Sequence, residues 1–302
     1  MKRRIIVTVL IPTVVILFVF IYSNSITAYS VSSKKQSHAK SSELIQALDN
    51  NHVPIVDYGY VNGIYVGPAR NPITIAHKAL SYYDALKIDA GNAKAKKSLI
   101  NNANWLVDNA VTHGNYSIFE YKFQWPPYGL KQPWYSAMAQ GEGIKALVRA
   151  YEVTKDKKYL DTAKMLLGSF FVEVKDEGVT YKTSNGWWYE EYASKDEPRE
   201  SRVLNGMMYA LLGVHEYYDY THDSKAKYIF DQGVTALKNS LPRYNYRDNY
   251  TYYDILGNIS PLQYHKAVIQ TLGPLYDITK EQIFKTYFYK WKHFKEPSES
   301  ML

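Results

Sequence analysis

The 302-residue chain contains no cysteine. Disulfide bonds and cysteine metal sites are therefore excluded, and a folded domain must be stabilised by its hydrophobic core. The 8 histidines are scattered, without His-x-x-x-His or His-Glu-x-x-His spacing, which argues against zinc hydrolysis. The sequence also lacks a glycine-rich loop that could cradle phosphates, which disfavours nucleotide use. We expect no metal, no cofactor and no nucleic-acid partner.

Tyrosine, by contrast, is abundant, with 30 residues against 10 phenylalanines. Its ring has an apolar body and a hydroxyl tip, which suits wet, polar clefts, including those that hold sugars. The formal charge of +7 is mildly basic, and part of it flanks the N-terminal apolar run. Such an excess is compatible with a polyanionic substrate and equally with a solvated basic surface.

The N-terminus predicts a membrane anchor. Residues 1–4 carry three basic side chains and precede an uncharged apolar run at residues 5–22, about the ~18 residues that a spanning helix needs. This charge pattern places the N-terminus inside and the rest outside. A cleaved signal peptide is the alternative, but the run exceeds a usual apolar core and no Ala-x-Ala site follows. We therefore expect a cytoplasmic tail (1–4), a transmembrane anchor (5–22), a Ser- and Lys-rich stalk (23–52), an extracytoplasmic domain (53–295) and a tail (296–302).

From residue 71 the sequence predicts a mainly α-helical domain. Asn71-Pro72 is an N-cap followed by proline at the first helical position. Eight helices are expected, at residues 72–87, 92–112, 133–153, 157–173, 200–220, 224–240, 261–275 and 280–294. Short links join them in pairs, whereas long aromatic links with strand-like stretches separate the pairs. Four helical hairpins with short β-hairpins between the pairs imply a closed α/α toroid whose loops form a sugar cleft at one end.

The long link at residues 176–199 contains the strongest chemical candidate, WWYEEY at residues 187–192. If the segment is a strand, Glu190 and Tyr192 point one way and Glu191 the other. A carboxylate beside aromatic rings is poised for a raised pKa, the condition for acid–base catalysis near neutrality. The alternative is a structural loop whose acids pair with Lys195 or Arg199.

Other polar residues stand in apolar surroundings. Gln140 lies in a helix of small residues, where either a substrate hydroxyl or a loop carbonyl could bind it. Asn205 interrupts a helix next to Gly206, which indicates a kink or a side chain needed in the cleft. Single residues such as Tyr253 or His265 would, on their own, more often have structural roles.

Taken together, the motifs resemble the C-terminal catalytic domain of the D-glucuronyl C5-epimerases, which convert glucuronate to iduronate in heparan-type chains. The shared motifs are WYSAMAQG at residues 134–141, LVRAY at 147–151, WYEEY at 188–192, VLNGMMY at 203–209, YYD at 252–254 and YH at 264–265. They occur in family order across residues 60–294. The ordered set is specific, whereas any one motif is not.

The resemblance implies an α/α barrel and a homodimer. It places catalysis on Glu191, Tyr192 and Tyr264, with Tyr253 also required. The substrate-binding positions that it implies are Trp134, Tyr135, Gln140, Trp188, Glu190, Asn205, Asp254 and His265. One group would remove the C5 proton and another would return a proton on the opposite face of the sugar ring. The family arginine that meets the substrate carboxylate is replaced by Leu256, and Lys266, Arg247 or Arg202 could substitute.

The expected activity is therefore C5-epimerisation of glucuronate in an anionic polysaccharide. A polysaccharide lyase is the main alternative, because it begins with the same proton abstraction. A glycoside hydrolase would need two carboxylates on either side of the scissile bond, roughly 5 to 9.5 Å apart. A non-catalytic glycan-binding protein is the remaining alternative.

Overall fold

The computed structural model describes residues 45–196 and 199–295. The predicted cytoplasmic tail, the anchor at residues 5–22, most of the stalk and the tail at 296–302 lie outside these residues. Within the described ranges, no helix has the length and apolar character required to cross a bilayer.

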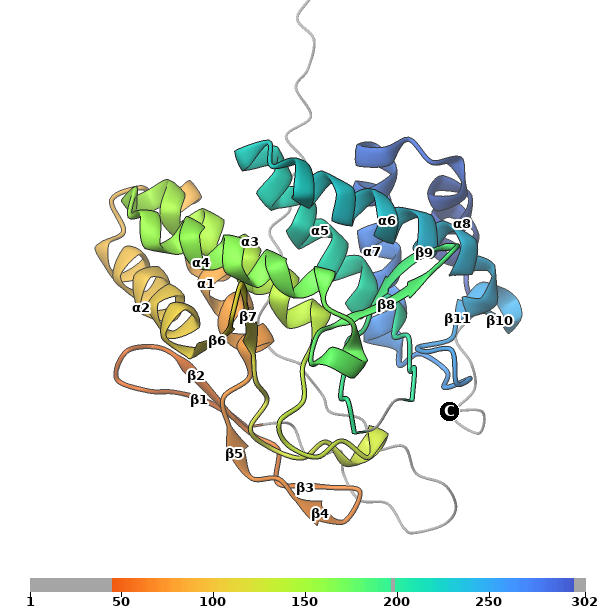
Figure 1. Ribbon diagram of the computed structural model, residues 1–302, viewed down its shortest axis with the longest axis horizontal. Helices are drawn as coiled ribbons and strands as arrows, with labels where there is room; N and C mark the ends of the chain where they lie inside the picture. Colours follow the sequence, from red (N-terminus) through yellow and green to blue (C-terminus); the bar gives the residue numbers. More distant parts are fainter. Residues whose placement is uncertain (1–44, 197–198, 296–302) are drawn as a thin grey trace, which may run out of the picture.

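All eight predicted helices are present (Figure 1). They are α1 (Pro72–Ile88), α2 (Ala93–Asn109), α3 (Ala137–Thr154), α4 (Lys157–Gly168), α5 (Leu204–Thr221), α6 (Ser224–Ser240), α7 (Leu262–Thr279) and α8 (Gln282–Lys292). Asn71 caps α1 as predicted, because its side chain accepts a hydrogen bond from the Ile73 amide. Helix α3 begins later than residue 133, because Trp134 and Tyr135 form β-bridges with other loops.

The helices form four hairpins arranged side by side from α1/α2 to α7/α8 (Figure 1). Helix α1 packs against α3, α3 against α5, and α5 against α7, with α2, α4, α6 and α8 on the outside. Within the described residues α1 and α7 do not pack extensively against each other. The four hairpins of the predicted α/α toroid are therefore present, but in the described residues they form an open arc and not the closed ring that was expected.

Short antiparallel β-elements fill the links between the helix pairs, as predicted. They are β6 (Ala110–His113) with β7 (Tyr116–Phe119), β8 (Thr180–Thr183) with β9 (Gly186–Tyr189), and β10 (Asn245–Tyr246) with β11 (Tyr250–Thr251). Short 3₁₀ turns accompany them, at η1 (Pro126–Tyr128), η2 (Ser169–Phe171), η3 (Val174–Asp176), η4 (Leu241–Tyr244) and η5 (Arg247–Asn249).

Before α1, strands β1 (Ile45–Leu48), β2 (Pro54–Asp57) and β5 (Pro68–Ala69) form a three-stranded sheet. A hairpin of β3 (Tyr60–Val61) and β4 (Ile64–Tyr65) projects from it. Residues 45–52, expected in the stalk, thus belong to the folded part.

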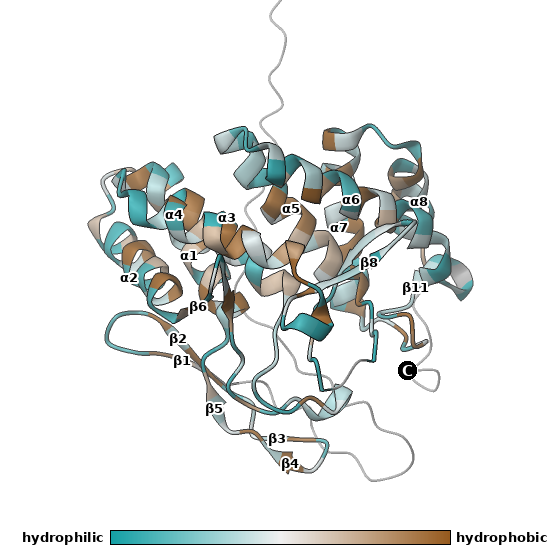
Figure 2. Ribbon diagram, in the orientation of Figure 1, coloured by the Kyte–Doolittle hydropathy of each residue, from teal (hydrophilic) through white to brown (hydrophobic). Residues whose placement is uncertain are grey.

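The core lies between the inner and outer helices, with hydrophilic residues on the outer surfaces (Figure 2). Helices α3 and α5 approach closely through small residues. A Cβ atom on Gly141 would lie 2.6 Å from the Ala210 Cα, and one on Gly213 would lie 2.1 Å from the Gly141 carbonyl oxygen. The small residues of α3 are therefore explained by close helix packing.

The N-terminal ends of the inner helices meet at one end of the arc. The Tyr121 hydroxyl donates to the Asn71 side chain at the start of α1. The first amide of α3, from Ala137, donates to the Glu190 carbonyl, and the first amide of α5, from Leu204, donates to the Tyr253 carbonyl. The positive ends of the helix dipoles therefore face the three aromatic links, an arrangement that favours bound anions.

Candidate active site

The segment at residues 190–192 lies between the N-termini of α3 and α5. Its backbone is fixed by the Ala137 amide, 2.8 Å from the Glu190 carbonyl oxygen, and by the Glu190 amide, 2.7 Å from the Val179 carbonyl oxygen. Strand β9 ends at Tyr189, and the chain bends at residues 191–192. Because the strand has ended, the predicted strict alternation of side chains is wrong.

Glu190 is fully buried and hydrogen-bonded on one side of this segment. The Ser201 hydroxyl donates to it at 2.6 Å, the Arg202 amide at 2.9 Å and the Tyr192 amide at 3.3 Å. Burial raises the pKa of Glu190, whereas the hydrogen bonds from these donors lower it, and burial has the larger effect. Lys195, a possible partner, pairs instead with Glu177. Glu190 therefore fixes the loop before α5.

Glu191 has a different environment. Its side chain is 6% exposed, and its Oε2 atom has no hydrogen-bond partner among the described residues. Burial, followed by the charge of Glu190, raises the pKa of Glu191 to about 8, while the Tyr192 hydroxyl acts in the opposite direction. A Cβ atom on residue 206 would lie 2.1 Å from Glu191 Oε2, so only glycine at that position leaves the carboxylate its space.

Four tyrosines adjoin this carboxylate. The hydroxyls of Tyr192 and Tyr253 lie 3.2 Å apart, and the ring centroids of Tyr253 and Tyr264 are 5.1 Å apart. Tyr128 stacks on Tyr192 with a centroid distance of 4.4 Å. Burial and the Glu191 charge raise the pKa of Tyr192 and of Tyr253 well above 10. Both phenols are therefore protonated at neutral pH and can donate hydrogen bonds or protons.

This geometry brings together the four predicted catalytic residues, contributed by three separate regions of the chain. The family model described as D-glucuronyl C5-epimerase C-terminus matches residues 112–293, which is more than half of the chain. The chain belongs to this family. The matched residues include the whole candidate site, and the family is one of carbohydrate epimerases.

Two curated relatives extend the comparison. An uncharacterised protein of Methanocaldococcus jannaschii is 28% identical over 263 residues, covering 81% of this chain and 84% of that protein. The D-glucuronyl C5-epimerase of Caenorhabditis elegans is 33% identical over 214 residues, covering 63% of this chain. The matched region spans only 33% of the nematode enzyme's length.

Solved structures support the fold. Cellobiose 2-epimerase from Bacillus thermoamylovorans superposes with a TM-score of 0.57 at 10% identity, covering 76% of this chain and 63% of that one. A GH76 α-mannanase from Bacteroides thetaiotaomicron gives a TM-score of 0.51 at 14% identity, covering 77% and 62%. At these identities the likeness shows a toroid-like helical architecture and nothing of the chemistry.

Three of the predicted substrate-binding residues adjoin the cluster. Trp134 is buried, and its ring lies 5.7 Å from that of Tyr192. Asp254 accepts a 2.7 Å hydrogen bond from the Tyr128 hydroxyl and also binds the amides of Leu256 and Asn258. Asn205 is buried beside Gly206, and its side-chain oxygen has no partner in the described part of the chain.

The structure places four other predicted residues away from the cluster. Gln140 is buried and binds backbone groups of Phe119 and Ser136, so the loop backbone is its partner. Trp188 stacks on Tyr244 in the core, and Tyr135 is buried and bridges Ala193 through its backbone. His265 is buried, contacts the Thr251 hydroxyl and stacks on Tyr250. Burial lowers the pKa of His265 to about 4, so it is a neutral core residue.

Sequence reasoning missed Tyr128 and Trp125. Tyr128 stacks on Tyr192 and is held by Asp254, and the Trp125 ring lies parallel to Tyr192 at 6.4 Å. Both flank Pro126-Pro127 in the first long link. The run of aromatic and proline residues could have indicated these two positions, because prolines predict a rigid turn and such a turn holds its aromatic side chains in fixed directions.

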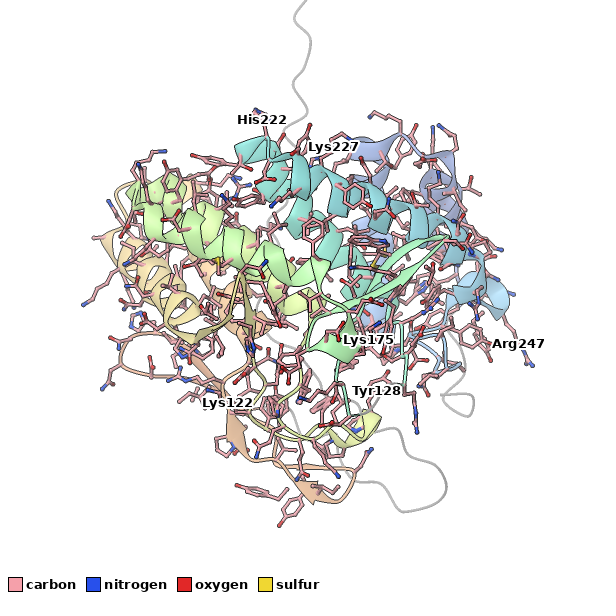
Figure 3. The ribbon with its side chains drawn as sticks, in the orientation of Figure 1. Lys122, Tyr128, Lys175, His222, Lys227 and Arg247 are labelled. Atoms are coloured by element: carbon pink, nitrogen blue, oxygen red, sulfur yellow. The ribbon has the colours of Figure 1, made fainter. Side chains whose placement is uncertain are left out.

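The three cations proposed to replace the family arginine are not directed at the tyrosine cluster. Arg202 pairs with Glu200, and Arg247 lies over the Tyr246 ring. Figure 3 shows Arg247 at the edge of the molecule, away from Tyr128. Lys266 is exposed and lies two residues after Tyr264, hence on the opposite side of α7. Tyrosine hydroxyls and helix N-termini are thus the groups positioned to receive negative charge at the site.

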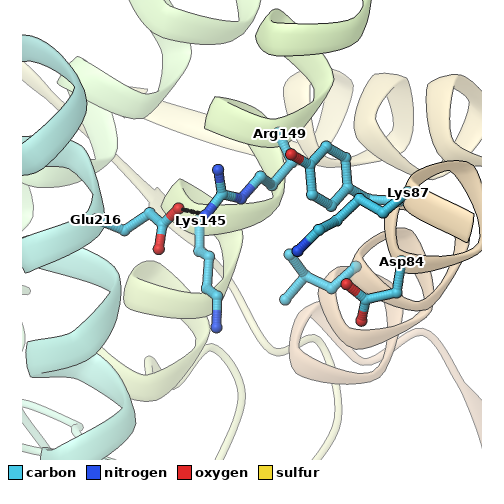
Figure 4. Close-up of a pocket in the computed structure, with 7 residues that line it drawn as sticks. Asp84, Lys87, Lys145, Arg149 and Glu216 are labelled. Carbon is cyan, nitrogen blue, oxygen red and sulfur yellow. Dashed lines mark ion pairs between the residues drawn. The ribbon is translucent and has the colours of Figure 1, made fainter. Parts of the chain in front are cut away.

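A cavity of about 270 Å³ lies toward the C-terminal ends of α1, α3 and α5. Its lining includes Lys87, Lys145, Arg149 and Glu216, with the two lysines pointing into the space (Figure 4). None of its lining residues belongs to the tyrosine cluster, which occupies the N-terminal ends of the inner helices. The cavity is therefore separate from the candidate active site.

Replacing Gly206 with alanine should impair the site more than the fold. The added methyl group would overlap Glu191 Oε2, so we expect the carboxylate to move and sugar-epimerising activity to fall by about 10²-fold. The control is Gly273→Ala in α7, where the nearest heavy atom to a new Cβ is 4.0 Å away. Activity assays and circular dichroism would check the prediction, and full activity in Gly206→Ala would contradict it.

Proposed function

We propose that the protein is a uronic-acid C5-epimerase acting on glucuronate residues of an anionic polysaccharide. The observation that carries this proposal is the buried Glu191 Oε2, which has no hydrogen-bond partner among the described residues, beside the hydrogen-bonded Tyr192–Tyr253 pair. A carboxylate whose pKa is raised to about 8 is a base matched to neutral and mildly alkaline pH. A phenol that stays protonated is an acid suited to return a proton.

In the proposed reaction, Glu191 removes the C5 proton and becomes a carboxylic acid. The electron pair left at C5 delocalises into the adjacent carboxylate of the sugar, which gives an enolate. Hydroxyls of Tyr192 and Tyr253 donate hydrogen bonds to this negative charge. The Tyr264 hydroxyl then protonates C5 on the opposite face. The resulting phenolate regains a proton, and Glu191 loses one, before the next turnover.

The arrangement of the two adjacent glutamates disfavours a glycoside hydrolase. Hydrolysis needs one carboxyl group on each side of a scissile bond. Glu190 is buried against Ser201 and the Arg202 amide instead, and it is engaged by donors. Only Glu191 is left as a carboxyl group available to a substrate in this segment.

The test is incubation with glucuronate-containing oligosaccharides in deuterated water. Deuterium at C5 together with an iduronate product supports the epimerase. Absorbance from an unsaturated uronate would identify a lyase, and new reducing ends without that absorbance would identify a hydrolase. Binding without any of these products would identify a glycan-binding protein.

The pH dependence of exchange provides a further prediction. Because Glu191 acts as the base, only its ionised fraction is active, and its pKa in the free enzyme is about 8. We expect kcat/KM to rise about tenfold per pH unit below pH 8 and to level off above it. Initial exchange rates between pH 6 and 9.5 would measure this, with circular dichroism confirming that the fold persists. A rate that is flat or falls across this range would contradict the role of Glu191.

Partners and cellular location are also proposals. We propose that residues 5–22 anchor the protein in a membrane, with the catalytic domain on the extracytoplasmic side where it can reach the polysaccharide. A homodimer is proposed from the family resemblance.

A further inference from the structure

The β3–β4 hairpin presents two exposed tyrosines. Its turn residues Asn62 and Gly63 both have positive φ, 49° and 78°, as a tight two-residue hairpin turn requires. The register pairs Tyr60 with Tyr65 and Val61 with Ile64. Val61 is buried, whereas Tyr60 is 75% exposed and Tyr65 is 59% exposed. The hairpin therefore buries one small side chain and leaves two large aromatic rings in solvent.

The two rings are held in a defined pose. Their centroids are 5.2 Å apart. A Cβ atom on residue 67 would lie 2.9 Å from the Tyr65 Cζ atom, so the Tyr65 ring rests directly on the backbone of Gly67, whose φ is +69°. Glycine is needed here both for the backbone conformation and for the space under the ring. The two rings are tilted by 55° to each other, so the pair presents two differently inclined aromatic faces.

The base of the hairpin adjoins the candidate active site through aromatic contacts. Tyr58, two residues before Tyr60, packs on Trp125 with a centroid distance of 5.6 Å. Trp125 in turn lies parallel to Tyr192 at 6.4 Å. Figure 1 shows the hairpin on the side of the arc where the links between the helix pairs run, and Figure 3 shows Tyr128 on the same side. The hairpin therefore starts next to the rings that flank Tyr192, within reach of a long substrate seated there.

We propose that Tyr60 and Tyr65 form a sugar-stacking subsite for the polysaccharide chain, at a distance from the uronate that reacts. The inference rests on the proposed function, because it assigns the occupant as a more distant sugar of the same substrate. One face of a pyranose ring offers C–H groups that pack on a flat aromatic ring, and the tyrosine hydroxyls can meet the sugar hydroxyls. Exposed aromatic surface near a candidate active site is the type of surface that such a ligand covers.

The test variant is Tyr60→Thr/Tyr65→Thr, which removes both rings and keeps residues that favour a strand. We expect KM for long glucuronate polymers to rise about tenfold with kcat unchanged, because a tenfold weaker binding corresponds to the loss of about one stacking contact. Oligosaccharides too short to reach the hairpin should show unchanged kcat and KM. The control is Tyr289→Thr on α8, a tyrosine that is 53% exposed on another part of the surface.

The outcomes separate this inference from the proposed reaction. If wild-type protein exchanges C5 and the double variant has the same KM for polymer, the subsite is wrong while the epimerase stands. If the wild type shows no exchange, affinity electrophoresis in gels that contain the polymer decides instead. Retardation of wild type but not of the variant would support the subsite, and equal migration would overturn it. If the variant converts a dimer into a monomer in light scattering, the surface serves self-association and the proposal is wrong.

Discussion

Glu191→Gln should reduce C5-proton exchange by about 10²- to 10⁴-fold, the range that general base catalysis contributes. Glutamine keeps the size of the side chain and removes its ability to take a proton. The pocket around residue 191 should persist, because Gly206 leaves the same space for either side chain. Substrate affinity should change little, so the loss should be in kcat. Exchange at C5 measured at pH 8.5, where about half or more of Glu191 is ionised in the wild type, would check the prediction.

The matched control is Glu177→Gln, the same substitution in the same long link. Glu177 pairs with Lys195 on the surface and lies outside the tyrosine cluster. Its exchange rate should equal that of the wild type. If Glu191→Gln keeps more than a tenth of wild-type exchange, Glu191 is not the base, and a tyrosine would have to supply that role.

The fold could largely be predicted from the sequence, since caps, links and hydrophobic spacing act locally. Asn71 and Asp223, for example, accept the amide hydrogen bonds that begin α1 and α6. What local signals could not define was the closure of the ring. Closure depends on whether α1 and α7 meet. Whether they meet is determined by the crossing angles at three successive helix contacts, whose small contributions add up. The four hairpins were therefore predictable, but the open arc was not.

The sequence predicted which residues form the candidate site better than it predicted the directions of their side chains. Consecutive residues on a helix point about 100° apart, so Tyr264 can face the cluster while His265 enters the core against Tyr250. Glu190 and Glu191 separate because β9 ends at Tyr189, a boundary that no residue in the motif marks. A resemblance in a motif does not distinguish between the residues of that motif. The backbone conformation determines which of their side chains point toward the site.

A second large effect of Glu191→Gln should be on stability, and it should depend on pH. The folded-state pKa of Glu191 is about 8, raised from 4.5. The folded state therefore favours the protonated form, and this contribution to stability is fully present below pH 4.5 and is lost as pH rises through 8. At pH 9 the wild type must keep a buried carboxylate ionised, at a cost on the order of 5 kcal/mol. The uncharged glutamine does not have this cost, although its buried amide would lack hydrogen-bond partners, which lowers stability by a similar amount at every pH.

Urea unfolding at pH 5 and pH 9 would measure this difference. We expect the free energy of unfolding of Glu191→Gln, relative to wild type, to increase by about 3–5 kcal/mol between the two pH values. Glu177→Gln provides a control of opposite sign, because the hydrogen bond from Lys195 lowers the pKa of Glu177 and stabilises its charged form. That variant should lose a little stability at the higher pH, and only a little, since the pair is at the surface.

Parallel stability curves for wild type and Glu191→Gln between pH 5 and pH 9 would contradict the raised pKa directly. The predicted kinetic midpoint near pH 8 would then lose its physical basis, because a carboxylate that ionises near its ordinary pKa is already fully ionised at neutral pH. The two measurements are therefore linked through one group: the ionisation that destabilises the folded protein at high pH is the same ionisation that should activate exchange. Coincidence of the stability transition and the kinetic midpoint near pH 8 is the result that identifies Glu191 as the base.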